Sequence, residues 1–144
     1  MNADLENKLL EKYPRLFADH KKPPAESLMC YGCDHGDGWF FIIDSMCRCI
    51  QQHTEKSESQ YKFLQVKEKF GGLRVYDTGG DEYTSGIIDM AEAISRRTCE
   101  VCGSPGKLNS SGLWVKTLCE SHASEMGYAR TQKLNPEDRE QNDT

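Results

Sequence analysis

The sequence predicts an α+β fold in which helices surround a β-hairpin. Two observations carry this prediction: three stretches repeat apolar residues at helical spacing, and two strand-like runs meet at a pair of glycines between the second and third stretches. A third observation is that cysteines recur in pairs beyond the last of these stretches, which predicts a small C-terminal finger. The 144 residues are expected to form one domain over 1–128, with the finger at 99–122 and a disordered polar tail at 129–144.

The first two helices follow from apolar residues spaced three or four apart. The first is expected from about Ala3 to Tyr13, with a further turn through Phe17 after the interruption at Pro14. The second covers WFFIIDSMCRCIQQH, residues 39–53. Asp37 precedes it and is the residue type that caps a helix N-terminus.

The next two runs, YKFLQVKEKF and LRVYD, predict strands at 61–70 and 73–77. A tight turn at Gly71-Gly72 joins them and sets a register, because a two-residue loop defines which residues face each other. The expected pairs are Phe70 with Leu73, Lys69 with Arg74, Glu68 with Val75, and Lys67 with Tyr76. One face is then apolar except for Glu68, which either reaches solvent at an edge or has a buried role.

The opposite face of this hairpin gathers a basic patch with one aromatic residue. Its members are Lys67, Lys69, Arg74 and Tyr76. We expect the patch to bind a phosphate or an acidic partner, and its alternative interpretation is a solvated face.

Helical spacing returns from Asp81 to Arg97 and leads the chain directly to Cys99. A short second hairpin is expected from strands at 107–109 and 113–117 around Ser-Ser-Gly, followed by a helix at about 119–128.

Composition excludes several classes of protein. No apolar run approaches the roughly 18 residues that cross a membrane, and the N-terminus lacks a signal-peptide pattern, so we expect a cytoplasmic protein with no membrane partner. The net charge of −5 opposes a general role in coating nucleic acid. Seven cysteines in a reducing compartment, an odd number, favour metal ligation over a disulfide framework.

The paired cysteines have the spacing of a zinc site. Cys99 and Cys102 are followed after sixteen residues by Cys119 and His122, each pair with two residues between its members. Three sulfurs and one nitrogen form the tetrahedral shell that Zn²⁺ accepts. The first pair, followed by Gly103, is typical of a zinc knuckle. The order of knuckle, hairpin and helix-borne ligands predicts a treble-clef-like finger.

Two other uses of these residues fit less well. A redox Cys-x-x-Cys is expected at a strand end that opens a long helix, whereas this pair follows a helix. A catalytic zinc ion keeps an open coordination position, which four protein ligands would fill, so the zinc is expected to be structural. Apart from His122 the histidines are His20, His35 and His53, all far upstream, and no catalytic residues are predicted.

A second metal site remains an alternative for Cys30, Cys33, His35 and Cys47. Cys47 and Cys49 lie two apart on the second expected helix, where their side chains point about 200° apart and cannot both face one ion. Cys49 shares the apolar stripe and is interpreted as a small core residue.

Three motifs resemble small, largely uncharacterised proteins encoded by bacteriophages and prophages. They are GDGWFFIID (36–44), QVKEKFGGLRVY (65–76), and CEVCGSPGKL with WVKTLCESHA (99–108 and 114–123). The resemblance covers most of residues 29–123 and implies that Cys99, Cys102, Cys119 and His122 bind zinc, but it implies no activity. The chain differs from that group in Cys30, Cys33 and Cys49.

Two functions follow as expectations. The first is a non-enzymatic, zinc-stabilised phage accessory protein that acts in the host cytoplasm, where it binds and modulates or inhibits a host protein, for example a component of host defence. The second is a nucleic-acid-binding regulator or nuclease accessory that uses the zinc finger and the basic patch.

Overall fold

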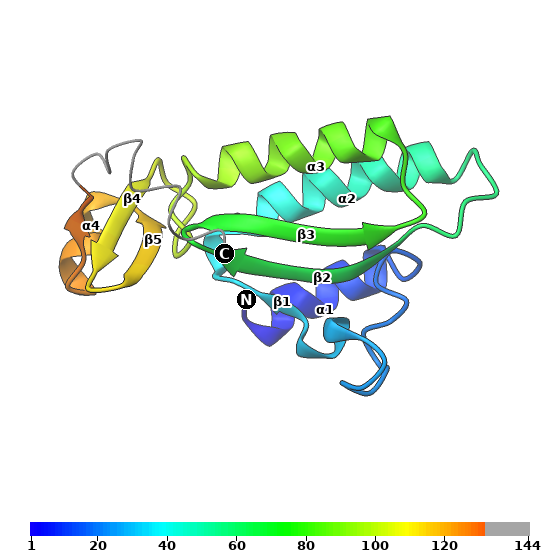
Figure 1. Ribbon diagram of the computed structural model, residues 1–144, viewed down its shortest axis with the longest axis horizontal. Helices are drawn as coiled ribbons and strands as arrows, with labels where there is room; N and C mark the ends of the chain where they lie inside the picture. The colour runs from blue at the N-terminus through cyan, green and yellow to red at the C-terminus, as the bar shows by residue number, and fades with distance from the viewer. Residues whose placement is uncertain (132–144) are drawn as a thin grey trace, which may run out of the picture.

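Two small sheets mark two regions of the chain, which we call the core region (residues 1–98) and the finger (residues 99–131). The computed structural model describes residues 1–131 and shows a mixed α+β fold with four α-helices in that range (Figure 1). The finger lies at one end of the core region, beside the turn between strands β2 (Lys62–Lys69) and β3 (Gly72–Thr78) and the C-terminal end of helix α3 (Glu82–Ser95). Among the described residues, no helix has the length and apolar character needed to cross a lipid bilayer.

The three helices of the core region are confirmed close to their expected bounds. Helix α1 spans Ala3–Lys12, α2 spans Phe40–Thr54 and α3 spans Glu82–Ser95. Asn2 caps α1 by accepting a hydrogen bond from the Leu5 amide, and Asp81 forms a capping box with Thr84 at the start of α3.

The predicted cap of α2 is wrong. A short 3₁₀ turn, η2 (Asp37–Trp39), precedes α2, and Asp37 caps no amide of that helix. Its carboxylate instead accepts hydrogen bonds from the backbone N and the side-chain Nδ2 of Asn2, at 2.7 and 2.8 Å. Asp37 therefore joins the start of α1 to the start of α2, a contact between residues 35 positions apart.

Strands β2 (Lys62–Lys69) and β3 (Gly72–Thr78) form the expected hairpin, but the predicted register is wrong by two residues. The turn residues are Phe70 and Gly71, with φ of 51° and 79°, so Lys69 faces Gly72 and Lys67 faces Arg74. A turn with positive φ at both central residues matches the twist of the strands. Because the shift is even, the two faces keep the predicted residues except Phe70, which lies in the turn and is exposed.

Glu68 helps to explain this turn. Its Oε1 accepts a hydrogen bond of 2.6 Å from the Gly71 amide, which stabilises a turn that places Phe70 in an unfavourable backbone region. Glu68 is thus a half-buried residue with a local structural role.

Strand β1 (Cys33–Asp34) pairs in parallel with β2 and completes the sheet in the order β1-β2-β3. It follows the 3₁₀ turn η1 (Leu28–Tyr31), and two residues are too few to show strand alternation in the sequence. A register irregularity near Leu64 lets Phe63 and Val66 both be fully buried although they lie three apart.

One side of this sheet forms the main hydrophobic core. Leu9 of α1, Ile43 of α2 and Phe63 and Val66 of β2 belong to the same buried cluster. Helix α3 runs along the free edge of β3 (Figure 1), where Ser95 Oγ accepts a hydrogen bond from the Leu73 amide and Glu92 Oε1 accepts one from the Val75 amide. The edge of the sheet is therefore covered.

The finger contains the second predicted hairpin, β4 (Lys107–Ser111) and β5 (Trp114–Leu118), followed by α4 (Glu120–Glu125). Helix α4 is shorter than expected because Gly127 (φ 73°) reverses the chain, and strand β6 (Ala129–Arg130) then pairs with β4. The predicted disorder is therefore wrong for residues 129 and 130. Thr131 also bonds to β4, since its amide and hydroxyl donate to Leu108 O, and the rest of the predicted tail, 132–144, lies outside the described residues.

Candidate metal centre

Two separate turns supply the candidate ligands. Cys99 and Cys102 lie in the loop between α3 and β4, whereas Cys119 is the N-cap residue of α4 and His122 lies within that helix. The Cys119 side chain makes no capping hydrogen bond to the helix, so its sulfur is available for a metal ion. The β4–β5 hairpin brings the two turns together.

The four ligand atoms lie within 4.8 Å of one another. Cys119 Sγ is 3.2 Å from His122 Nδ1, Cys99 Sγ is 3.6 Å from the same nitrogen, and Cys102 Sγ is 3.9 Å from Cys119 Sγ. A tetrahedral zinc ion, with bonds of about 2.3 Å to sulfur and about 2.0 Å to nitrogen, holds neighbouring ligand atoms about 3.5–3.8 Å apart. The four residues are close enough to bind a metal ion, and all three cysteines are free thiols.

The loop around the first pair has a knuckle-like backbone. The Gly103 amide donates to Cys99 O at 2.9 Å and the Cys99 amide donates to Ser104 O at 2.7 Å, with Gly103 at a φ of 80°. Hydrogen bonds from Ser104, the side chain first and the backbone second, lower the pKa of Cys102 to about 6. Burial raises the pKa of the Cys99 thiol, so a cation is needed to stabilise its thiolate.

The knuckle is attached to the core region through the segment before α2. The Gly38 amide donates to Glu100 O at 2.8 Å, and the Trp39 indole donates to Thr98 O at 2.9 Å. Glu100 is buried and accepts from the Gly36 amide at 3.1 Å while it pairs with Lys116 Nζ at 2.9 Å. This role of Glu100 was not predicted from the sequence. A carboxylate placed between the two ligands Cys99 and Cys102 is the pattern that could have indicated it.

The structure does not bring the proposed second set of ligands together. Within residues 1–131, the group Cys99, Cys102, Cys119 and His122 is the only His/Cys/Asp/Glu cluster with metal-binding spacing. Cys33 is buried, which raises its pKa to about 12, and the His35 Nδ1 lies 2.8 Å from Gly36 O. Cys33 therefore belongs to the hydrophobic core, and His35 is a buried polar residue.

The assignment of Cys49 to the core also needs correction. Cys47 is fully buried in the main core, whereas Cys49 is only partly buried. The buried face of α2 keeps Ile43, Met46 and Ile50 of the predicted stripe but includes Cys47 in place of Cys49.

The basic patch of the hairpin is only partly free. Arg74 lies 3.7 Å from Glu92 of α3, which offsets its charge, whereas Lys69 lies over the Phe70 ring at 5.6 Å. Lys67 faces Arg74 across the strands, and Tyr76 is exposed. Partner binding by Lys67, Lys69, Arg74 and Tyr76 stays a prediction.

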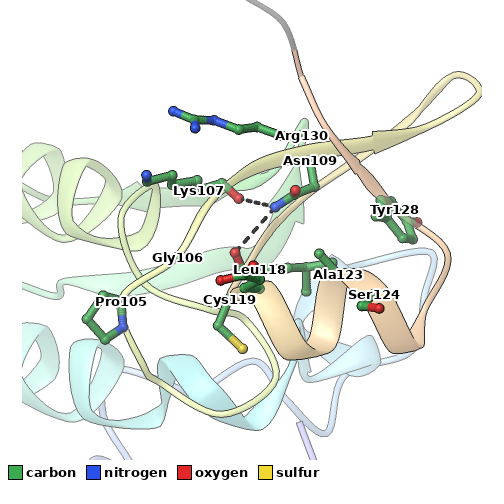
Figure 2. A pocket seen from close by; sticks show the side chains of 11 residues that line it. Pro105, Gly106, Lys107, Asn109, Leu118, Cys119, Ala123, Ser124, Tyr128 and Arg130 are labelled. Atoms are coloured by element: carbon green, nitrogen blue, oxygen red, sulfur yellow. Dashed lines mark hydrogen bonds between the residues drawn. The ribbon is translucent and has the colours of Figure 1, made fainter.

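Two features of the finger were not predicted. One is a cavity of about 620 Å³ between β4, α4 and β6, whose lining includes Lys107, Tyr128 and Arg130 (Figure 2). The other is the tip of the β4–β5 hairpin, where Leu113 is fully exposed and Trp114 is 78% exposed. The sequence signal for the tip is a Leu-Trp pair directly after the turn residue Gly112.

Comparison of the chain with family models, curated proteins and solved structures finds no match.

Proposed function

We propose that the finger binds one structural Zn²⁺ ion and belongs to the treble-clef type. Three sulfurs and one imidazole nitrogen are a donor set typical of zinc, and the spacings among them match a tetrahedral shell. The order of knuckle, hairpin and helix supports the treble-clef assignment. With zinc bound, these four ligands leave no position for a substrate or an activated water, and this supports a structural role.

On this basis we propose a non-enzymatic binding protein whose partner is another protein. The observation that carries this proposal is the exposed pair Leu113 and Trp114 at the hairpin tip. Tryptophan is enriched among the residues that dominate the energy of protein–protein contacts, and two adjacent large apolar side chains in water favour burial in a partner. The metal holds the strands that present them.

The partner is proposed to be a host protein, which the bound chain modulates or inhibits in the cytoplasm. The three motifs that resemble phage-encoded proteins support this context. The net charge of −5 also favours a protein partner over general binding to nucleic acid.

Affinity capture from a bacterial lysate tests this proposal. The full-length protein is compared with the double variant Leu113→Ser, Trp114→Ser and with the matched control Phe41→Ser, whose side chain on α2 is also 78% exposed. We expect one protein to be captured by the wild type and the control and lost with the tip variant. Identical captured proteins for all three would contradict the role of the tip.

A further variant, Lys67→Glu with Lys69→Glu, tests whether the contact extends to the basic patch. These two lysines are chosen because Arg74 already pairs with Glu92. If the patch takes part, this variant loses the captured protein more completely at low salt than at high salt.

A further inference from the structure

Two hollows adjoin each other on the finger. The first is the cavity of Figure 2, bounded by β4, α4 and β6. The second, of about 680 Å³, lies between the end of α3 and β4. Pro105, Gly106, Lys107 and Arg130 line both hollows, so the two lie next to each other.

The second hollow is strongly basic. Its lining includes four cations and no carboxylate: Arg96 and Arg97 from the end of α3, Lys107 from β4 and Arg130 from β6. None of the four forms an ion pair with a carboxylate among residues 1–131, whereas the neighbouring Lys116 is paired with Glu100. Four such cations in a chain of net charge −5 form a local positive field that attracts an anion.

The first hollow has a different character. Tyr128, Leu118 and Ala123 give it an aromatic and apolar surface, and Asn109 and Ser124 add polar groups. Glu120 of α4 adds a carboxylate, which disfavours a phosphate in this hollow and leaves the basic second hollow as the place for one. Asn109 Nδ2 donates to Lys107 O at 2.6 Å and Leu118 O at 3.3 Å, which holds the amide in place. Its volume lies within the roughly 300–1,000 Å³ of small-molecule sites.

Figure 2 shows the basic side chains and the aromatic side chain around one cavity. The side chains of Lys107 and Arg130 extend toward the same side, while Tyr128 lies at the other end of the cavity. A ligand that fills both hollows would place an anionic group near the cations and a flat ring beside Tyr128. A nucleotide has this combination of phosphate and base.

We infer that the two hollows bind one nucleotide unit of a single-stranded nucleic acid, with its phosphate among Arg96, Arg97, Lys107 and Arg130 and its base beside Tyr128. A single strand is assigned because its bases are free to stack on an aromatic side chain, whereas those of a duplex are already stacked. An acidic peptide would satisfy the cations but would leave the Tyr128 hollow without a ring. This site lies apart from the Leu113–Trp114 tip, and neither proposal depends on the other.

The phosphate position is tested by measuring the affinity of the full-length, zinc-loaded protein for single-stranded DNA. The probe is a labelled 12-nucleotide strand of mixed sequence, and fluorescence anisotropy reports its binding. The double variant Arg97→Ala, Arg130→Ala removes two exposed cations, and we expect binding at least about tenfold weaker. The slope of log affinity against log salt should also fall by up to about 0.7, because the site neutralises one phosphate of a single strand. The matched control is Arg15→Ala with Arg48→Ala, two exposed arginines of the core region.

The base position is tested by Tyr128→Ala and Tyr128→Phe. Loss of the ring is expected to weaken binding about fivefold or more, and phenylalanine should restore it. Because Tyr128 also packs against the finger interior, zinc content is measured for both variants. If Tyr128→Ala loses zinc, the phenylalanine variant and the arginine pair still test the site.

Several outcomes would overturn the inference. Equal weakening by the arginine control would mean that only net charge matters, and equal affinity for duplex DNA would exclude a role for a free base. Equal competition by polyglutamate would identify the ligand as an acidic peptide. Displacement by a mononucleotide at the same concentration as the strand would assign the site to free nucleotides instead.

Discussion

The core region and the finger are stabilised by different means. Eighteen buried residues form the cluster of the core region, whereas the buried cluster of the finger has three, one of which is the ligand Cys99. Three buried residues make a small hydrophobic core, so we propose that a bound metal ion contributes much of the stability of the finger.

Removal of the metal should give the largest difference between the two regions. Structural zinc sites contribute about 10–16 kcal/mol, so chelation or Cys102→Ser is expected to unfold the finger and leave the core region folded. Hydrogen exchange measures this as loss of protection in β4 and β5 with retained protection in β2 and β3. Cys49→Ser is the control, since Cys49 lies on α2 away from the ligands. Retained protection of β4 and β5 in protein shown to be metal-free would contradict the comparison.

The glycines at the turn between β2 and β3 test the contact between the regions. Gly71 has a φ of 79°, its Cβ would collide with Leu108 of the finger, and its carbonyl accepts a hydrogen bond of 2.6 Å from Thr117 Oγ1. We expect Gly71→Val to lower the free energy of unfolding by about 1–3 kcal/mol.

Gly72 is the matched position for this comparison. A Cβ there would meet the end of the flexible Arg96 side chain, 2.7 Å from Cζ, and Gly72 is not among the positive-φ residues. Gly72→Val should therefore destabilise less in thermal or denaturant unfolding. A larger effect at Gly72 than at Gly71 would favour the turn that the sequence predicted.

The smallest effect concerns one carboxylate of the core region. Asp19 is buried and pairs with Lys62 at 2.9 Å and Lys22 at 3.1 Å, and the hydrogen bond from Lys62 lowers its pKa. A lowered pKa in the folded state adds stability above the unfolded pKa of about 3.9, and that stability is lost as the pH falls through the folded value.

Asp19→Asn should accordingly cost about 1 kcal/mol at pH 7 and nothing once the pH is well below that range. Denaturant unfolding across pH measures the difference between the two proteins. Exchange protection of β4 and β5 should be the same in both. A constant difference down to pH 2 would mean that charge pairing is not the cause.

The sequence alone determined the local features. Helical periodicity located α1, α2 and α3 within a few residues, because an amphipathic stripe must face a core wherever that core lies. The spacing of Cys99, Cys102, Cys119 and His122 identified the candidate metal centre, because each pair brings two donor atoms to one turn. The faces of the β2–β3 hairpin followed from the two-residue period of a strand.

Tertiary structure decided what depends on distant partners. The turn lies at Phe70-Gly71 and not at the predicted Gly71-Gly72. Glu68 accepts a hydrogen bond from the Gly71 amide, and Thr117 of the finger donates one to the Gly71 carbonyl. The tendency of glycine pairs to form turns carries no information about these contacts. Asp37 caps no helix because Asn2 lies beside it.

The basic hollow has the same origin. Arg96 and Arg97, Lys107 and Arg130 come from three separate segments and share one surface only because β6 returns along β4 next to the end of α3. A sequence pattern records the chemistry of each segment, but the distance between segments is set by packing and hydrogen bonds across the whole chain.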